Sequence, residues 1–146
     1  MKVYLEAMGC RLNAAEIESL ARDFAGGGHT VVTYPEAADV IVLNSCAVTA
    51  TASRKSHRRL RALHRLSPDA RLAVVGCWAT EADLKIRALP AVRWVVPNVD
   101  KARTVEIITG ELSDSAAWSP GRWGHTRAFL GVQDGCDHLC TYCITR

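Results

Sequence analysis

The sequence contains no long hydrophobic run, no leader-like beginning and no strong excess of one charge. No stretch of about 18 apolar residues occurs, although 49% of the 146 residues are hydrophobic, so we expect no membrane-spanning segment. Residues 1–6 break their apolar run with a glutamate, which argues against a secretory signal. The formal net charge of +3 is mild, so a surface for polyanions has to come from a local cluster of basic residues.

The chain has six cysteines but no secretion signal. Disulfides persist in oxidising compartments, so this combination favours metal binding in a reducing one. We therefore expect a cytoplasmic protein whose cysteines hold metal. No internal repeat or low-complexity tract interrupts the chain.

Three of the cysteines lie close together near the end of the sequence. Cys136, Cys140 and Cys143 have the spacing C-x3-C-x2-C, which suits a loop wrapped around one inorganic centre. A four-iron cluster is normally held by four thiolates, so three would leave one iron open for chemistry. The alternative is a zinc knuckle with His125 or His138 as its fourth ligand, although the usual second C-x2-C pair is missing.

Apolar runs and helical periodicities alternate along the first 110 residues. Strands are predicted at 2–8, 29–34, 39–43, 71–75 and 93–96. A first helix is predicted to begin at a cap, Asn13, and to end at the glycines 26–28. Three further helices are predicted at 49–66, 81–89 and 101–108. Strands that alternate with helices form right-handed β-α-β units. The sequence therefore predicts an α/β fold with an open, mostly parallel five-stranded sheet and flanking helices.

The composition changes beyond Gly110. Residues 1–110 are predicted to form one domain, residues 111–125 a linker without periodicity, and residues 126–146 the first strand and cysteine loop of a second domain. A loop that holds a cluster needs a protein body around it, and the sequence stops at Arg146. We therefore expect the sequence to be the N-terminal portion of a longer protein and to be inactive by itself.

The other three cysteines occupy the same predicted position in three different units. Cys10, Cys46 and Cys77 each stand one to three residues past a predicted strand. Ligands of open parallel sheets bind outside the carboxyl ends of the strands, so these thiols are predicted to converge on a second metal centre. The alternative is that all three are buried cysteines that act as small hydrophobic residues.

One predicted helix carries an unusual density of positive charge. Residues 54–65 contain six cations and no acidic residue. Four of the six fall on one helical face and two flank it, so the helix could lie along an RNA backbone. The alternative is an ordinary solvated face. The predicted RNA-binding residues are Arg54, Lys55, Arg58, Arg59, Arg61 and Arg65.

Four segments, taken in order, resemble one enzyme family. They are residues 8–13 (MGCRLN), 44–49 (NSCAVT), 76–79 (GCWA) and the terminal cysteine loop, in which Tyr142 stands just before Cys143. Together they are similar to the methylthiotransferases, which are radical S-adenosylmethionine (SAM) enzymes. Residues 46–56 and 126–136 look most like the branch that acts on N6-threonylcarbamoyladenosine in tRNA.

The resemblance implies two [4Fe-4S] clusters, an auxiliary one on Cys10, Cys46 and Cys77 and one on the terminal loop. It implies that the terminal cluster passes an electron to SAM, whose adenine lies against Tyr142. The expected partners are tRNA, SAM and a reducing electron donor, with no DNA and no membrane. The expected reaction adds a methylthio group to C2 of N6-threonylcarbamoyladenosine at tRNA position 37.

Other functions remain open at this point. The substrate could instead be N6-isopentenyladenosine in tRNA or an aspartate of a ribosomal protein, since other branches of the family act on these. If the native chain were this short, a non-catalytic iron–sulfur module for RNA binding or electron transfer would be the better interpretation.

Overall fold

A computed structural model describes residues 1–89, 91–111, 136, 138, 140 and 141. Five parallel strands form one sheet in the order β2-β1-β3-β4-β5. The strands are β1 (Lys2–Ala7), β2 (Thr30–Val32), β3 (Val40–Ser45), β4 (Arg71–Gly76) and β5 (Val92–Val96). The helices are α1 (Arg11–Gly26), η1 (Pro35–Ala37), α2 (Ala50–Leu66), α3 (Cys77–Glu81), α4 (Asp83–Arg87), η2 (Asn98–Arg103) and α5 (Thr104–Thr109).

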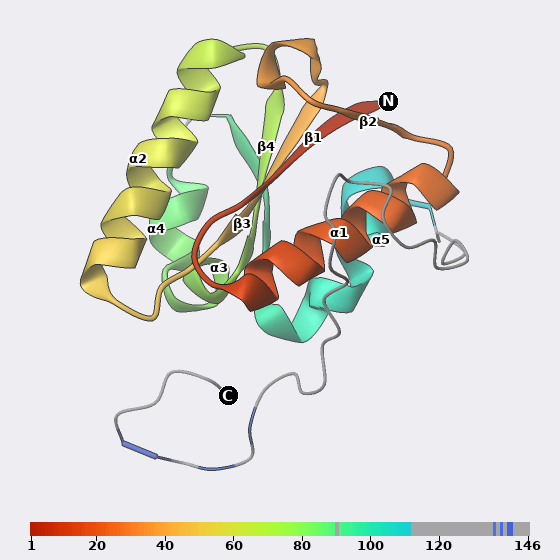
Figure 1. Ribbon diagram of the computed structural model, residues 1–146. Helices are drawn as coiled ribbons and strands as arrows, with labels where there is room; N and C mark the ends of the chain where they lie inside the picture. Colours follow the sequence, from red (N-terminus) through yellow and green to blue (C-terminus); the bar gives the residue numbers. More distant parts are fainter. Residues whose placement is uncertain (90, 112–135, 137, 139, 142–146) are drawn as a thin grey trace.

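Helices cover both faces of the sheet, with α1 and α5 on one side and α2, α3 and α4 on the other (Figure 1). The strands β3 and β4 are buried almost throughout because they lie at the centre of this three-layer arrangement. Alternate residues of β3 face opposite layers: Ile41 and Leu43 pack towards Leu60 of α2, whereas Val40 and Val42 pack towards Phe24 of α1.

The helix α2 begins where its sequence provides a cap. The hydroxyl of Thr49 accepts a hydrogen bond from the backbone N–H of Ala52 at 3.1 Å, which satisfies one of the free donors of the first turn. Leu60 and Leu63 are fully buried against the sheet. The helix ends at Leu66, and the next residue but one is Pro68, which disfavours helical backbone before it.

The predicted α/β fold with a five-stranded sheet is confirmed, and every strand pair is parallel. Three predicted helices were wrong in detail. The helix predicted at 101–108 is the 3-10 helix η2 followed by α5, which begins at Thr104. The helix α1 begins at Arg11 with Cys10 as its N-cap, so Asn13 lies inside the first turn and is buried. The single helix predicted at 81–89 is two short helices, and the first of them begins at Cys77.

The predicted linker beyond Glu111 and the predicted strand of a second domain lie outside the described residues, as do Tyr142 and Cys143. Within the described part of the chain, every helix is too short or too polar to cross a membrane.

Candidate functional site

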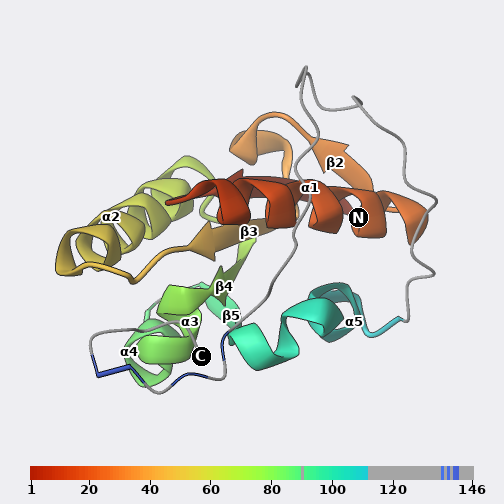
Figure 2. The same cartoon turned by 60° about the horizontal axis from the view of Figure 1, so that its bottom comes forward.

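The first three cysteines stand at the carboxyl ends of neighbouring strands. Cys10 follows β1 and caps α1, Cys46 directly follows β3, and Cys77 directly follows β4 as the first residue of α3. In the sheet, β3 lies between β1 and β4. The helices α1, α2 and α3 therefore all begin at one edge of the sheet, which comes forward in Figure 2. All three cysteines are free, and only Cys46 is buried.

The loop after β1 packs tightly against Cys46. Gly9 has a φ of +117°, a conformation that favours glycine. A Cβ atom at this position would lie 2.5 Å from the Cβ of Cys46 and 3.2 Å from its Sγ. The glycine before Cys10 thus lets the first cysteine loop come up against the second cysteine.

A buried polar network lies beneath this edge. The Cys10 thiol donates a hydrogen bond to Oδ1 of Asn13 at 3.0 Å, and Nδ2 of Asn13 donates to Oδ1 of Asn44 at 3.0 Å. Nδ2 of Asn44 then donates to Glu16 at 2.8 Å, and the other carboxylate oxygen of Glu16 accepts from Lys101 at 2.6 Å. Asn13 and Asn44 are buried, so these bonds offset the cost of taking the amides out of water. The network fixes the start of α1 relative to the end of β3.

The third cysteine, Cys77, contacts the helix η2. Nδ2 of Asn98 lies 3.6 Å from Sγ of Cys77 as a hydrogen-bond donor. The backbone N–H of Asn98 donates to the hydroxyl of Thr80 at 2.9 Å, and that hydroxyl donates to the carbonyl of Gly76. Because Asn98 and Lys101 both belong to η2, this segment connects the Cys77 loop with the network under Cys10.

The donor set suits iron–sulfur chemistry, because thiolates are the ligands that such clusters use. Three free thiols at the carboxyl ends of adjacent strands are compatible with such a group. Among the described residues, however, no three His, Cys, Asp or Glu side chains are grouped as they would be around a metal ion. Of the terminal loop, the structure describes Cys136 and Cys140 only as half-buried thiols.

The basic helix α2 presents most of its cations to solvent. Five of the six predicted RNA-binding side chains are exposed, and these are Arg54, Lys55, Arg58, Arg61 and Arg65. Lys55, Arg58, Arg61 and Arg65 border one surface hollow of about 580 Å³ together with Met8. Such exposed cations are accessible to a polyanion, whereas the members of a buried ion-pair network would not be.

Arg59 differs from the other five cations. Its guanidinium donates to both carboxylate oxygens of Glu6, at 2.6 and 2.7 Å, and the Arg59 side chain is only 36% exposed. Hydrogen bonding to Glu6 raises the pKa of Arg59, and burial together with the Glu6 charge raises the pKa of the Tyr4 phenol. Arg59 thus joins α2 to β1, and its charge is largely balanced inside the protein.

Comparison with known proteins identifies the family. The family model described as "Uncharacterized protein family UPF0004" matches residues 2–97, which is more than half of the chain and includes β1 to β5. The chain belongs to this family. The edge of the sheet that carries Cys10, Cys46 and Cys77, here called the cysteine edge, lies entirely inside the matched region.

Relatives of this UPF0004 protein are named as tRNA methylthiotransferases. The threonylcarbamoyladenosine tRNA methylthiotransferases MtaB of Aquifex aeolicus and Bacillus subtilis are each 30% identical to it, over 99% and 97% of this chain. The tRNA-2-methylthio-N(6)-dimethylallyladenosine synthase of Chloroherpeton thalassium is 29% identical over 98% of this chain. The aligned parts cover 39%, 35% and 36% of these relatives, so the chain spans little more than a third of their length. The resemblance to methylthiotransferases seen in the sequence is confirmed.

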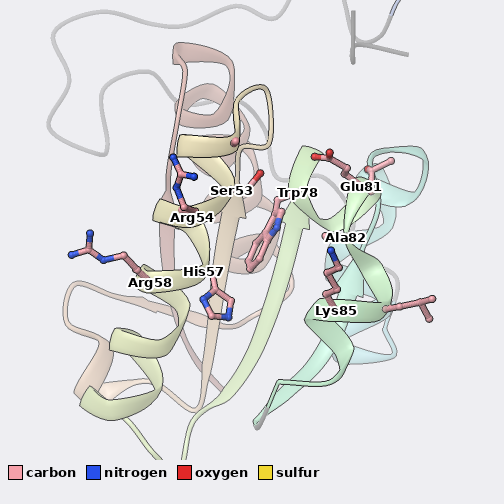
Figure 3. Close-up of a pocket in the computed structure, with 11 residues that line it drawn as sticks. Ser53, Arg54, His57, Arg58, Trp78, Glu81, Ala82 and Lys85 are labelled. Carbon is pink, nitrogen blue, oxygen red and sulfur yellow. The ribbon is translucent and has the colours of Figure 1, made fainter.

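The UPF0004 protein also has a cleft that the sequence did not predict. The cleft has a volume of about 810 Å³ and lies between α2 and the α3–α4 segment (Figure 3). The rings of His57 and Trp78 lie between these two walls, with their centroids 6.1 Å apart and their planes perpendicular. Lys85 of α4 lies across from them.

Sequence reasoning also missed the polar residues that connect the cysteine loops. Asn13 was interpreted as a helix cap, and Asn44 stood at the end of an apolar strand without an assigned role. An amide that follows a fully apolar strand is a signal that could have been used, because a buried amide needs partners. Glu16, Lys101 and Asn98 carried no such signal.

Proposed function

We propose that this chain is part of a tRNA methylthiotransferase that adds a methylthio group to C2 of N6-threonylcarbamoyladenosine at tRNA position 37. The observation that carries the proposal is the placement of Cys10, Cys46 and Cys77 just after the carboxyl ends of three adjacent strands. Family membership and the names of the relatives support the same reaction class.

The choice of nucleoside rests on the sequence rather than on overall identity. Relatives named for threonylcarbamoyladenosine and for dimethylallyladenosine are about equally similar to this chain, at 30% and 29%. Residues 46–56 and 126–136 favour the first substrate, since they look most like that branch of the family. N6-dimethylallyladenosine in tRNA is the alternative substrate.

The chemistry explains why cysteines rather than acids and bases carry the site. The C2–H bond of adenosine is not acidic, so no side-chain base can remove its hydrogen as a proton. Bound iron–sulfur clusters and SAM would supply the radical and sulfur chemistry that this step needs. The protein would hold the auxiliary cluster through Cys10, Cys46 and Cys77, with Asn98 donating a hydrogen bond towards Cys77 and Gly9 letting the loop before Cys10 approach Cys46 closely.

Product analysis tests the nucleoside. The purified full-length protein that contains this chain, reconstituted with iron and sulfide without oxygen, is given SAM, a reductant and tRNA that carries either N6-threonylcarbamoyladenosine or N6-dimethylallyladenosine. Mass spectrometry of the digested tRNA should find the methylthio group on the threonylcarbamoylated nucleoside. A product only on the dimethylallyl nucleoside would establish the alternative substrate.

The exposed cations of α2 are expected to bind the tRNA backbone. Replacing Arg58 and Arg61 by glutamate should weaken tRNA binding by roughly tenfold or more at moderate salt and flatten its salt dependence, because fewer counterions are released. Binding is measured by fluorescence anisotropy at several salt concentrations. Iron content should not change, since both side chains are exposed and lie on α2 rather than on the cysteine loops.

The control is a variant with the same change in net charge at other places. Arg22 of α1 and Arg93 of β5 lie outside α2, and their double replacement by glutamate should leave the salt dependence close to that of the parent. Equal effects of the two double variants would show that only net charge matters. The helix α2 would then be an ordinary solvated face.

A further inference from the structure

The cleft between α2 and the α3–α4 segment adjoins two of the three cysteine loops. The helix α2 begins four residues after Cys46, and Ser56 of α2 donates a hydrogen bond to the carbonyl of Cys46 at 3.2 Å. The helix α3 begins at Cys77 itself, so Trp78 in the cleft is the next residue. A ligand in the cleft would therefore lie beside the cysteine edge.

The lining of the cleft combines flat rings with positive charge. Half-buried His57 and the largely buried ring of Trp78 form its inner part, while Arg54 and Lys85 border it from α2 and α4. The carboxylate of Glu81 is one negative group against the cations Arg54, Arg58 and Lys85. Figure 3 shows Arg58 extending away from the cleft, and the two other cations of the lining are Arg54 on α2 and Lys85 on α4.

Size and chemistry together select the ligand. A volume of about 810 Å³ falls within the range of about 300–1,000 Å³ that is usual for small-molecule sites. Rings that contact a base, with cations placed for its phosphate, are the recurring way in which proteins bind unpaired nucleotides. Arg54 donates to the hydroxyl of Thr51 at 3.2 Å in an exposed contact, which a phosphate oxygen could replace.

We infer that this cleft binds one unpaired nucleotide of the RNA substrate, with its base against His57 and the rim of Trp78 and its phosphate between Arg54 and Lys85. The inference rests on the proposed action on tRNA and extends it, because it assigns a second wall, α3–α4, to RNA recognition. The outer face of α2 would contact the neighbouring backbone. The cleft would direct one nucleotide of a single-stranded loop towards the cysteine edge.

Two variants test the two parts of the cleft in the reconstituted protein, with an anticodon stem–loop RNA as the probe. Lys85→Glu should weaken binding about three- to tenfold and make the negative slope of log affinity against log salt shallower by about 1, since one phosphate contact is lost. His57→Ala should weaken binding about fivefold or more without changing the slope, because it removes a ring contact rather than a charge. Lys85→Arg should keep the affinity of the parent, and Arg93→Glu on β5 is the matched charge control.

A blunt RNA duplex is the second probe. Lys85→Glu and His57→Ala should weaken binding of the duplex much less than that of the stem–loop, because only the stem–loop has unpaired bases. Equal losses on both probes would overturn the inference, as would stem–loop binding by both variants at the level of the parent. If these variants bind normally while Arg58→Glu/Arg61→Glu binds weakly, the inference that the cleft binds a nucleotide is wrong, and the proposed contact between α2 and RNA is retained. If all of them bind normally, the proposed RNA face is wrong as well.

Discussion

Replacing Cys46 by alanine in the full-length protein is expected to abolish formation of methylthiolated adenosine and to leave the cleavage of SAM to 5′-deoxyadenosine intact. Cys46 is the buried member of the three and follows β3, the strand between β1 and β4, so its loss removes the central thiol of the set. A cluster held by two thiolates should not persist. Iron in the reconstituted protein should fall from about eight atoms per chain, the content of two four-iron clusters, to about four, the content of one.

The matched control is Cys140→Ala in the terminal loop. This variant should also lose about four irons, but it should form neither 5′-deoxyadenosine nor methylthio product, since the electron would have no route to SAM. Both products are measured by mass spectrometry of one reaction, and far-UV circular dichroism checks that each variant is folded. Normal methylthiolation by Cys46→Ala would return Cys10, Cys46 and Cys77 to the role of ordinary core thiols.

The fold could be predicted because its signals are local. The apolar run at 40–43 indicated a central parallel strand, and β3 is indeed buried along its whole length. Leu20, Ala21 and Phe24 recur in the sequence with the spacing of one helical face, and these three residues are the apolar ones that α1 buries against the sheet. The start of α2 was also predicted to within one residue, and the structure shows that Thr49 caps the helix rather than beginning it.

The rest of the site could not be predicted, because it depends on contacts between distant residues. Glu6 and Arg59 are 53 residues apart, and Glu16 and Lys101 are 85 residues apart. A charge pattern shows that α2 is basic but not that Arg59 is balanced by a carboxylate on β1. The cleft beside α2 likewise exists only because α3 and α4 pack against the same face of the sheet.

Gly76, just before Cys77 at the cysteine edge, has a backbone conformation that requires glycine. It has φ +93° and ψ −160°, a region that is essentially restricted to glycine. A Cβ atom there would collide with Oδ1 of Asn44 and would lie 2.7 Å from the carbonyl oxygen of Ser45. Both neighbours are fully buried, and Asn44 is held by hydrogen bonds to Asn13 and Glu16, so neither can easily move away.

Gly76→Ala is therefore expected to lower the free energy of unfolding by about 4 kcal/mol. Backbone strain of about 1–3 kcal/mol and overpacking of about 1–3 kcal/mol both contribute. The control is Gly28→Ala: Gly28 also has a positive φ of +76°, but a Cβ atom there would meet nothing within 4 Å, so only the backbone cost of about 1–2 kcal/mol applies. Urea unfolding of the metal-free, reduced protein, followed by far-UV circular dichroism, measures both variants. Equal losses would show that the collision with Asn44 and Ser45 is relieved, and the edge beside Cys77 would then be more adaptable than its packing indicates.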